Sequence, residues 1–125
     1  MTLRGCGIVI TGASHGFGKA VGQACVDAGA DVLLCARGTA ELQETCRALR
    51  ARAGQGQHVL FQAADVSDPG AASELIQSAA ARLPCFTGLV NNAGIYGPKG
   101  RIEDVCWDEW VRAIQVNLFG TVLLC

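Results

Sequence analysis

The 125-residue sequence lacks the features that mark membrane and nucleic-acid-binding proteins. It contains no run of about 18 apolar residues, the length that a bilayer-spanning helix requires, and no recognisable signal sequence. Its formal net charge of −1 provides no large basic field for phosphate backbones or anionic lipids. We therefore expect a cytoplasmic protein that has neither a nucleic-acid nor a membrane partner.

Metal-binding and disulfide patterns are also missing. The seven cysteines are scattered along the chain, without a C-x-x-C pair or a Cys/His spacing that suits a metal. In a reducing compartment such cysteines act as small apolar side chains. We expect no metal site and no disulfide framework.

What the sequence does contain is enough apolar material for one folded unit. Half of the residues are hydrophobic, so a chain of this length can bury roughly 65% of its unfolded surface. Residues 1–125 are therefore interpreted as one domain.

Short apolar runs alternate with segments of helical periodicity. The runs at residues 7–11, 32–36, 59–63 and 88–91 resemble strands that are buried on both faces. Three helical segments separate them, and the third has Asp68 as an N-cap before Pro69. A last helix is expected from near Trp107, with Cys106 in place of a capping hydroxyl and an apolar face formed by Trp107, Trp110, Val111, Ile114 and Leu118. Strands joined by single crossover helices predict an α/β, doubly wound parallel sheet.

A glycine-rich segment connects the first strand to the first helix. Residues 11–18 read TGASHGFG. Gly12, Gly16 and Gly18 permit a tight turn and close backbone approach to a ligand, and the start of the helix suits a pyrophosphate. Ser14 adds a hydroxyl donor. A flexible turn is the alternative, but the position between a buried strand and a helix favours dinucleotide binding.

Four motifs in the right order resemble the short-chain dehydrogenase/reductase family. They are the Thr-Gly-(three)-Gly-x-Gly spacing, NNAG at residues 91–94, Asp65 in ADVSD and Asn117 in QVNLFG. The resemblance covers nearly the whole chain. It implies a Rossmann-like NAD(P)-binding domain over residues 1–125, truncated after about four strands and five helices and incomplete at its C-terminus.

The resemblance also implies a role for each matching position. Asp65 and Val66 would flank the adenine, although Asp65 could instead cap a loop. The NNAG segment would line the nicotinamide-side ribose with Asn92, Ala93 and Gly94, while Asn91 would tie neighbouring strands together; an ordinary turn is the alternative. Asn117 would take part in a proton relay as the catalytic residue. The cofactor loop would contribute Gly12, Ser14, His15, Gly16, Phe17 and Gly18.

The end of the second strand lacks the acidic residue that accepts a hydrogen bond from the ribose 2′-hydroxyl of NAD. Arg37 occupies this region instead. A 2′-phosphate carries roughly two negative charges, which an arginine can bind by charge-assisted hydrogen bonds. We therefore predict NADP as the cofactor rather than NAD, with His15 as a weaker second partner. The alternative is that Arg37 is simply a surface side chain.

The residues that would transfer a proton to the substrate are also missing. In the family, a serine orients the carbonyl, and a tyrosine assisted by a lysine four residues later acts as the acid. The only tyrosine here, Tyr96, has Lys99 three residues later, and Gly97 and Pro98 between them prevent a helix. We do not expect Tyr96 and Lys99 to be catalytic.

The sequence therefore predicts the cofactor-binding half of an NADP(H)-dependent oxidoreductase that acts on a small-molecule carbonyl or secondary alcohol. The full-length parent enzyme is expected to be a homo-oligomer. The 125-residue chain by itself is expected to be inactive. A non-catalytic module that senses NADP(H) or pairs with a longer relative is one alternative, and a truncated reading frame without a stable fold is another. The substrate is left open.

Overall fold

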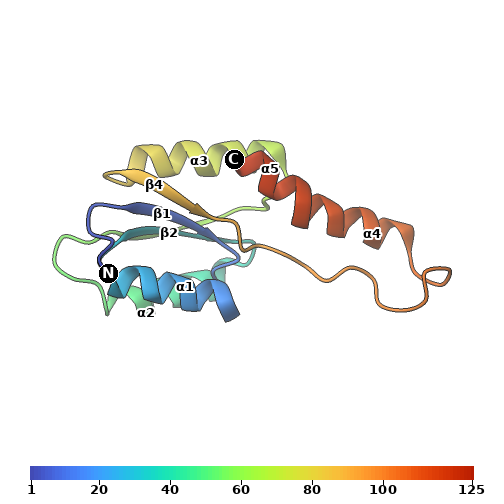
Figure 1. Cartoon of the computed structure of the whole chain (residues 1–125), viewed down its shortest axis with the longest axis horizontal. Helices are drawn as coiled ribbons and strands as arrows, with labels where there is room; N and C mark the ends of the chain where they lie inside the picture. Colours follow the sequence, from blue (N-terminus) through green and yellow to red (C-terminus); the bar gives the residue numbers. More distant parts are fainter.

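The computed structural model describes residues 1–125 as parallel strands alternating with helices (Figure 1). The first part of the chain contains β1 (Gly7–Thr11), α1 (Gly16–Asp27), β2 (Asp31–Ala36), α2 (Thr39–Arg50), β3 (Val59–Ala63), α3 (Pro69–Arg82) and β4 (Phe86–Val90). It is followed by α4 (Trp107–Ile114), a π-helix η1 (Gln115–Phe119) and α5 (Gly120–Leu124). The prediction of an α/β, doubly wound sheet is confirmed.

The strand order is β3-β2-β1-β4, and all pairings are parallel. The chain moves outward from β1 to β3 and then crosses back to add β4 on the other side of β1. The direction of winding therefore reverses between β1 and β4. In open α/β sheets, ligands bind beyond the carboxyl ends of the strands at such a switch point.

Apolar clusters cover the two faces of the sheet. Ile8, Ile10 and Leu34 point toward α1 and α2, where they join Leu42 and Leu49. The alternate strand positions point to the opposite face and pack with α3 and the end of the chain, in a cluster that includes Val9, Leu33, Cys35, Leu75, Ala79 and Leu124. Figure 1 shows α1 and α2 on one side of the sheet and α3 with α5 on the other. Burial on both faces explains the continuous apolar runs in the sequence.

The boundaries of β4 differ from the prediction of residues 88–91. The strand begins at Phe86 and ends at Val90. Gly7 pairs with Phe86 but Ile8 pairs with Gly88, so Thr87 is an extra residue in the ladder. This bulge locally disrupts the ladder between β1 and β4, and the polar residue Thr87 separates Phe86 from the apolar run on which the prediction was based.

The helix ends follow their capping residues. The Asp68 side chain accepts a hydrogen bond from the backbone N–H of Ala71 at 2.6 Å, which confirms it as the N-cap of α3. Cys106 makes no side-chain cap at α4. The expected apolar face extends over α4 and η1 and lies largely uncovered, since Trp107 of α4 and Leu118 of η1 are 75% and 52% exposed. In Figure 1 this helix extends away from the sheet.

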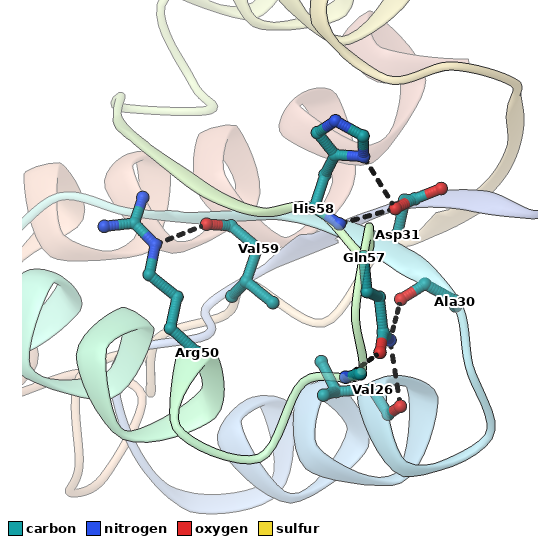
Figure 2. A network of polar contacts seen from close by, with 8 residues as sticks. Val26, Ala30, Asp31, Arg50, Gln57, His58 and Val59 are labelled. Carbon is teal, nitrogen blue, oxygen red and sulfur yellow. Dashed lines mark hydrogen bonds and ion pairs between the residues drawn. The ribbon is translucent and has the colours of Figure 1, made fainter.

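A polar network closes the amino ends of the strands (Figure 2). The side chain of Gln57 donates to the carbonyl oxygens of Val26 and Ala30, and Asp31 accepts from the backbone N–H of His58 at 2.6 Å. These bonds connect the loop before β3 to the end of α1 and the start of β2. They satisfy the loop backbone at the edge opposite the switch point.

No helix combines the length and hydrophobicity that a bilayer-spanning segment needs.

Candidate functional site

A cavity of about 1110 Å³ lies at the carboxyl ends of the strands. It receives residues from the loops after β1, β2, β3 and β4. Every predicted cofactor-binding residue except Gly18 lines it: Gly12, Ser14, His15, Gly16, Phe17, Arg37, Asp65, Val66, Asn92, Ala93 and Gly94. Segments that are far apart in the sequence thus meet at one site.

The glycines of the loop after β1 have different tasks. Gly12 has a φ of +62°, a conformation that favours glycine. A Cβ on Gly18 would overlap the carbonyl oxygen of Gly12 and lie 2.5 Å from Nδ2 of Asn92. Gly16, with a φ of +57°, has open space where its Cβ would be. Gly18 therefore keeps the loop closed, whereas Gly16 faces the cavity without filling it.

The first turn of α1 is available to an anion. His15 is its N-cap but makes no side-chain capping hydrogen bond, and the turn contains no acidic residue. The carbonyl oxygen of Ser14 in the preceding loop accepts a 2.7 Å hydrogen bond from the buried Thr45 hydroxyl. Free N–H groups and the positive end of the helix dipole thus face a loop that α2 holds in place.

Asn92 and Thr11 connect β1 to β4 at the cavity floor. The Thr11 Oγ1 accepts from the backbone N–H groups of Asn92 and Ala93 at 3.1 and 2.9 Å. The Asn92 side chain donates to the carbonyl oxygens of Thr11 and Gly12, both at 3.1 Å. Asn91 was expected to join the strands, and this assignment is wrong: its one side-chain hydrogen bond is to the Cys125 sulfur, at 3.6 Å. The second asparagine of the pair, and not the first, therefore faces the end of β1.

Asp65 is held by two polar neighbours. Its Oδ1 accepts from the backbone and hydroxyl of Ser67, and its Oδ2 accepts from Arg112 of α4 at 2.6 Å. Arg112 also donates to the Ser67 hydroxyl at 2.5 Å. Partial burial raises the pKa of Asp65, but the hydrogen bonds from Ser67 and Arg112 outweigh it and lower the pKa to about 2. The carboxylate is therefore ionised near neutral pH. No sequence pattern identified Arg112 as its partner, because the two residues are 47 positions apart.

Arg37, His15 and Glu41 occupy one part of the cavity wall. Arg37 is exposed and takes part in none of the ion pairs of the structure. His15 Nδ1 lies 2.9 Å from the Ser14 hydroxyl and 3.6 Å from Oε2 of Glu41. The sequence motif did not point to Glu41, because the family's acidic residue is expected at the end of the second strand and Glu41 follows β2 by five residues. The first turn of α2 brings it back to the cavity.

Asn117, the predicted catalytic residue, does not line the cavity but contacts the loop that does. Its Oδ1 accepts from the backbone N–H of Ile95 at 2.8 Å, and its Nδ2 donates to the Ile95 carbonyl oxygen at 2.9 Å. Asn117 lies in η1, a π-helix, and such segments occur frequently at functional sites. The paired hydrogen bonds fix the loop after β4 against this turn. A catalytic role for Asn117 stays a prediction.

Tyr96 and Lys99 lie in an extended segment with no helix between them. The Lys99 ammonium group is 4.7 Å from the centre of the Tyr96 ring, over its face rather than beside its hydroxyl. Tyr96 is 87% exposed at the cavity mouth. This is a cation–π contact. In a catalytic pair, the lysine would instead lie near the tyrosine hydroxyl that acts as the acid.

A second cavity of about 700 Å³ lies at the amino ends of the strands. Its wall includes Asp27 and Arg52, which form a two-point ion pair at 3.0 and 2.8 Å. Because their charges already satisfy each other and the helix end here is the C-terminus of α1, this cavity is less suited to a phosphate-bearing ligand. The cavity at the carboxyl ends is the better candidate.

Comparison with known proteins identifies the family. The short chain dehydrogenase family matches residues 7–125, and the chain belongs to it. Dehydrogenase/reductase SDR family member 7B of Rattus norvegicus is 37% identical over 128 residues, covering 98% of this chain and 38% of the rat protein. Among solved structures, L-sorbose reductase from Gluconobacter frateurii, complexed with NADPH and L-sorbose, has 30% identity and a TM-score of 0.90, covering 99% of this chain and 46% of that one. A short chain dehydrogenase from Mycobacterium smegmatis has 27% identity and a TM-score of 0.89, covering 98% and 50%.

The chain thus spans half or less of the length of these three proteins. Members of the family are oxidoreductases that use NAD(P) cofactors and act on small molecules. The match covers the segment that contains the cavity.

Proposed function

We propose that this chain forms the cofactor-binding part of an NADP(H)-dependent oxidoreductase that acts on a carbonyl or secondary alcohol by hydride transfer. One observation carries the proposal: the glycine loop, Arg37, Asp65 and the NNAG segment line one cavity at the switch point of the sheet. A small-molecule substrate, a cytoplasmic location and a homo-oligomeric parent protein remain predictions that accompany it.

The residues around the cavity fit a dinucleotide. The uncapped first turn of α1 would bind the pyrophosphate, and the open space beside Gly16 leaves room for it. Asp65 is ionised and could accept from the adenine amino group, with Val66 beside the ring. Asn92, Ala93 and Gly94 would line the second ribose. A bound NADP(H) would supply or accept the hydride.

Arg37 favours the phosphorylated nucleotide. Its guanidinium group is exposed at the cavity and free of ion pairs, so it would not need to break a bond to meet a 2′-phosphate. The L-sorbose reductase structure contains NADPH, which is a precedent in a similar protein. Both points support NADP over NAD.

The chain's own contribution to proton transfer is limited. No Tyr-x-x-x-Lys sequence occurs, since the only tyrosine is followed four residues later by Gly100. Asn117 would complete a relay whose acid is not among these residues. We therefore expect the chain to bind cofactor without reducing a panel of ketones, and cofactor-dependent turnover would contradict this part of the proposal.

Calorimetric titration tests the binding directly. The chain should bind NADPH, and also the fragment 2′,5′-ADP, because Arg37 and Asp65 would hold the adenosine half. Nicotinamide mononucleotide should bind more weakly, since it reaches neither residue. Equal affinity for the two fragments would contradict the assignment of Arg37, and no heat from NADPH would contradict the proposal as a whole.

A further inference from the structure

Glu41 places a negative charge next to the predicted position of the 2′-phosphate. It lines the same cavity as Arg37 and His15. Its only ionic partner is His15, at 3.6 Å, and the two side chains are 74% and 83% exposed. The carboxylate is therefore weakly held, in the cavity wall that also contains Arg37.

The charges in this region oppose each other. Arg37 attracts a 2′-phosphate, which carries roughly two negative charges at neutral pH. Glu41 repels the same group, while a 2′-hydroxyl has no charge to be repelled and can donate a hydrogen bond to a carboxylate. Both effects of Glu41 act in one direction, toward the unphosphorylated nucleotide.

We propose that Glu41 is a specificity-determining residue that weakens the preference of this cavity for 2′-phosphorylated nucleotides and so keeps NAD(H) within its range. The inference rests on the proposed function, because it assumes that the cavity holds the adenosine ribose beside Arg37. It assigns Glu41 the opposite effect to Arg37.

A matched control lies on the same helix. Glu44 is exposed like Glu41, but it pairs with Arg47 and does not line the cavity. Glu41→Gln and Glu44→Gln therefore remove the same charge from α2 at positions that differ in their access to the ligand. Both side chains are exposed, so neither change disturbs the core.

The measurement is the ratio of the dissociation constant for NADH to that for NADPH, determined by calorimetry for the unmodified chain and both variants. Removing one charge near a doubly charged phosphate in a water-like dielectric should raise this ratio by roughly three- to tenfold in Glu41→Gln. Glu44→Gln should leave the ratio unchanged, and Glu41→Lys should raise it further. The gain should shrink at high salt because surface charges are screened.

Two results would overturn the inference. The ratio could stay constant in Glu41→Gln, or it could rise equally in Glu44→Gln, which would make the effect one of overall charge. If the unmodified chain bound neither nucleotide, the proposed function itself would fail first. A normal affinity for both nucleotides with an unchanged ratio would remove only the role of Glu41.

Discussion

The hydroxyl of Thr11, at the end of β1, accepts the backbone N–H of Asn92, just beyond β4, at 3.1 Å, and the Asn92 side chain donates back to the Thr11 carbonyl oxygen at the same distance. This reciprocal pair joins the two strands at the point where the winding of the sheet reverses. It sets the position of both the glycine loop and the NNAG segment. The cavity depends on this contact between residues 81 positions apart.

Replacing Asn92 should separate these two segments. Asn92→Ala removes the side-chain donor to Thr11 and Gly12 and leaves two partly buried carbonyl oxygens without it. The expected loss is about 1–3 kcal/mol of unfolding free energy, measured by urea denaturation. Asn91→Ala is the control, because its side chain has only a 3.6 Å contact with a sulfur. Equal losses for both variants would contradict the assignment of the tie to Asn92.

Gly18 should tolerate no side chain. In Gly18→Ala the new Cβ would overlap the Gly12 carbonyl oxygen, so the loop must shift, at an expected cost of about 1–3 kcal/mol. The displaced loop should also bind NADPH more weakly. Gly38→Ala serves as a control in a thermal melt, since nothing lies within 4 Å of its Cβ and its φ is −83°. A melt for Gly18→Ala that matches Gly38→Ala would contradict this description of the loop.

Arg112 should make stability depend on pH through Asp65. The pKa of Asp65 is lowered to about 2 in the folded chain, whereas an unfolded aspartate titrates near 3.9. Its contribution is therefore complete above about pH 4 and is lost as the pH falls toward about 2. Arg112→Gln removes the hydrogen bond from Arg112 to Asp65 and leaves those from Ser67 in place, so the difference in unfolding free energy between the unmodified chain and the variant should narrow across this range.

Urea denaturation at a series of pH values measures this gap. The effect should be modest, because both side chains are 37% exposed and solvent screens the pair. Arg101→Gln is a suitable control: it removes an equal charge from an exposed pair with Glu103, which does not involve Asp65. A gap for Arg112→Gln that stays constant down to about pH 2 would show that the arginine acts by packing alone.

Arg37 should determine the affinity for NADPH. A charge-assisted hydrogen bond is worth about 1.5–3 kcal/mol, so Arg37→Asp should weaken NADPH binding by at least about tenfold and favour NADH. Arg47→Asp introduces the same charge change on α2, where Arg47 pairs with Glu44 outside the cavity. Calorimetry on both variants checks the prediction. Unchanged NADPH affinity in Arg37→Asp would show that Arg37 is a surface side chain that does not bind the cofactor.

Local patterns in the sequence predicted most of the fold. The apolar runs located β1 and β3, and Asp68 before Pro69 located the start of α3, because caps and buried strands depend on neighbouring residues. The bulge at Thr87 was not visible, since it depends on how β4 pairs with β1. The division of the last helix into α4, η1 and α5 was likewise not predicted. No proline or glycine marks the junction between α4 and η1, and the first glycine of this region is Gly120, where α5 begins.

The sequence predicted the residues of the candidate site that belong to motifs. It did not predict the residues that reach the site from other parts of the chain. The glycine loop and the NNAG segment can be identified in the sequence by their composition and order, and the fold brings them together. Arg112 and Glu41 have no motif: one reaches Asp65 from a helix far along the chain, and the other returns to the cavity through the first turn of α2. The choice between Asn91 and Asn92 also required the hydrogen-bond partners of each side chain, which two adjacent identical residues do not reveal in the sequence.

The most direct test of this account is a thermal melt of the purified chain, alone and with saturating NADPH or NADH. Ligand at about 100 times its dissociation constant stabilises the folded state by roughly 2.7 kcal/mol. The account predicts a cooperative transition that NADPH moves to higher temperature, and by more than an equal concentration of NADH. A cooperative transition that neither nucleotide shifts would contradict the assignment of the cavity as a dinucleotide site.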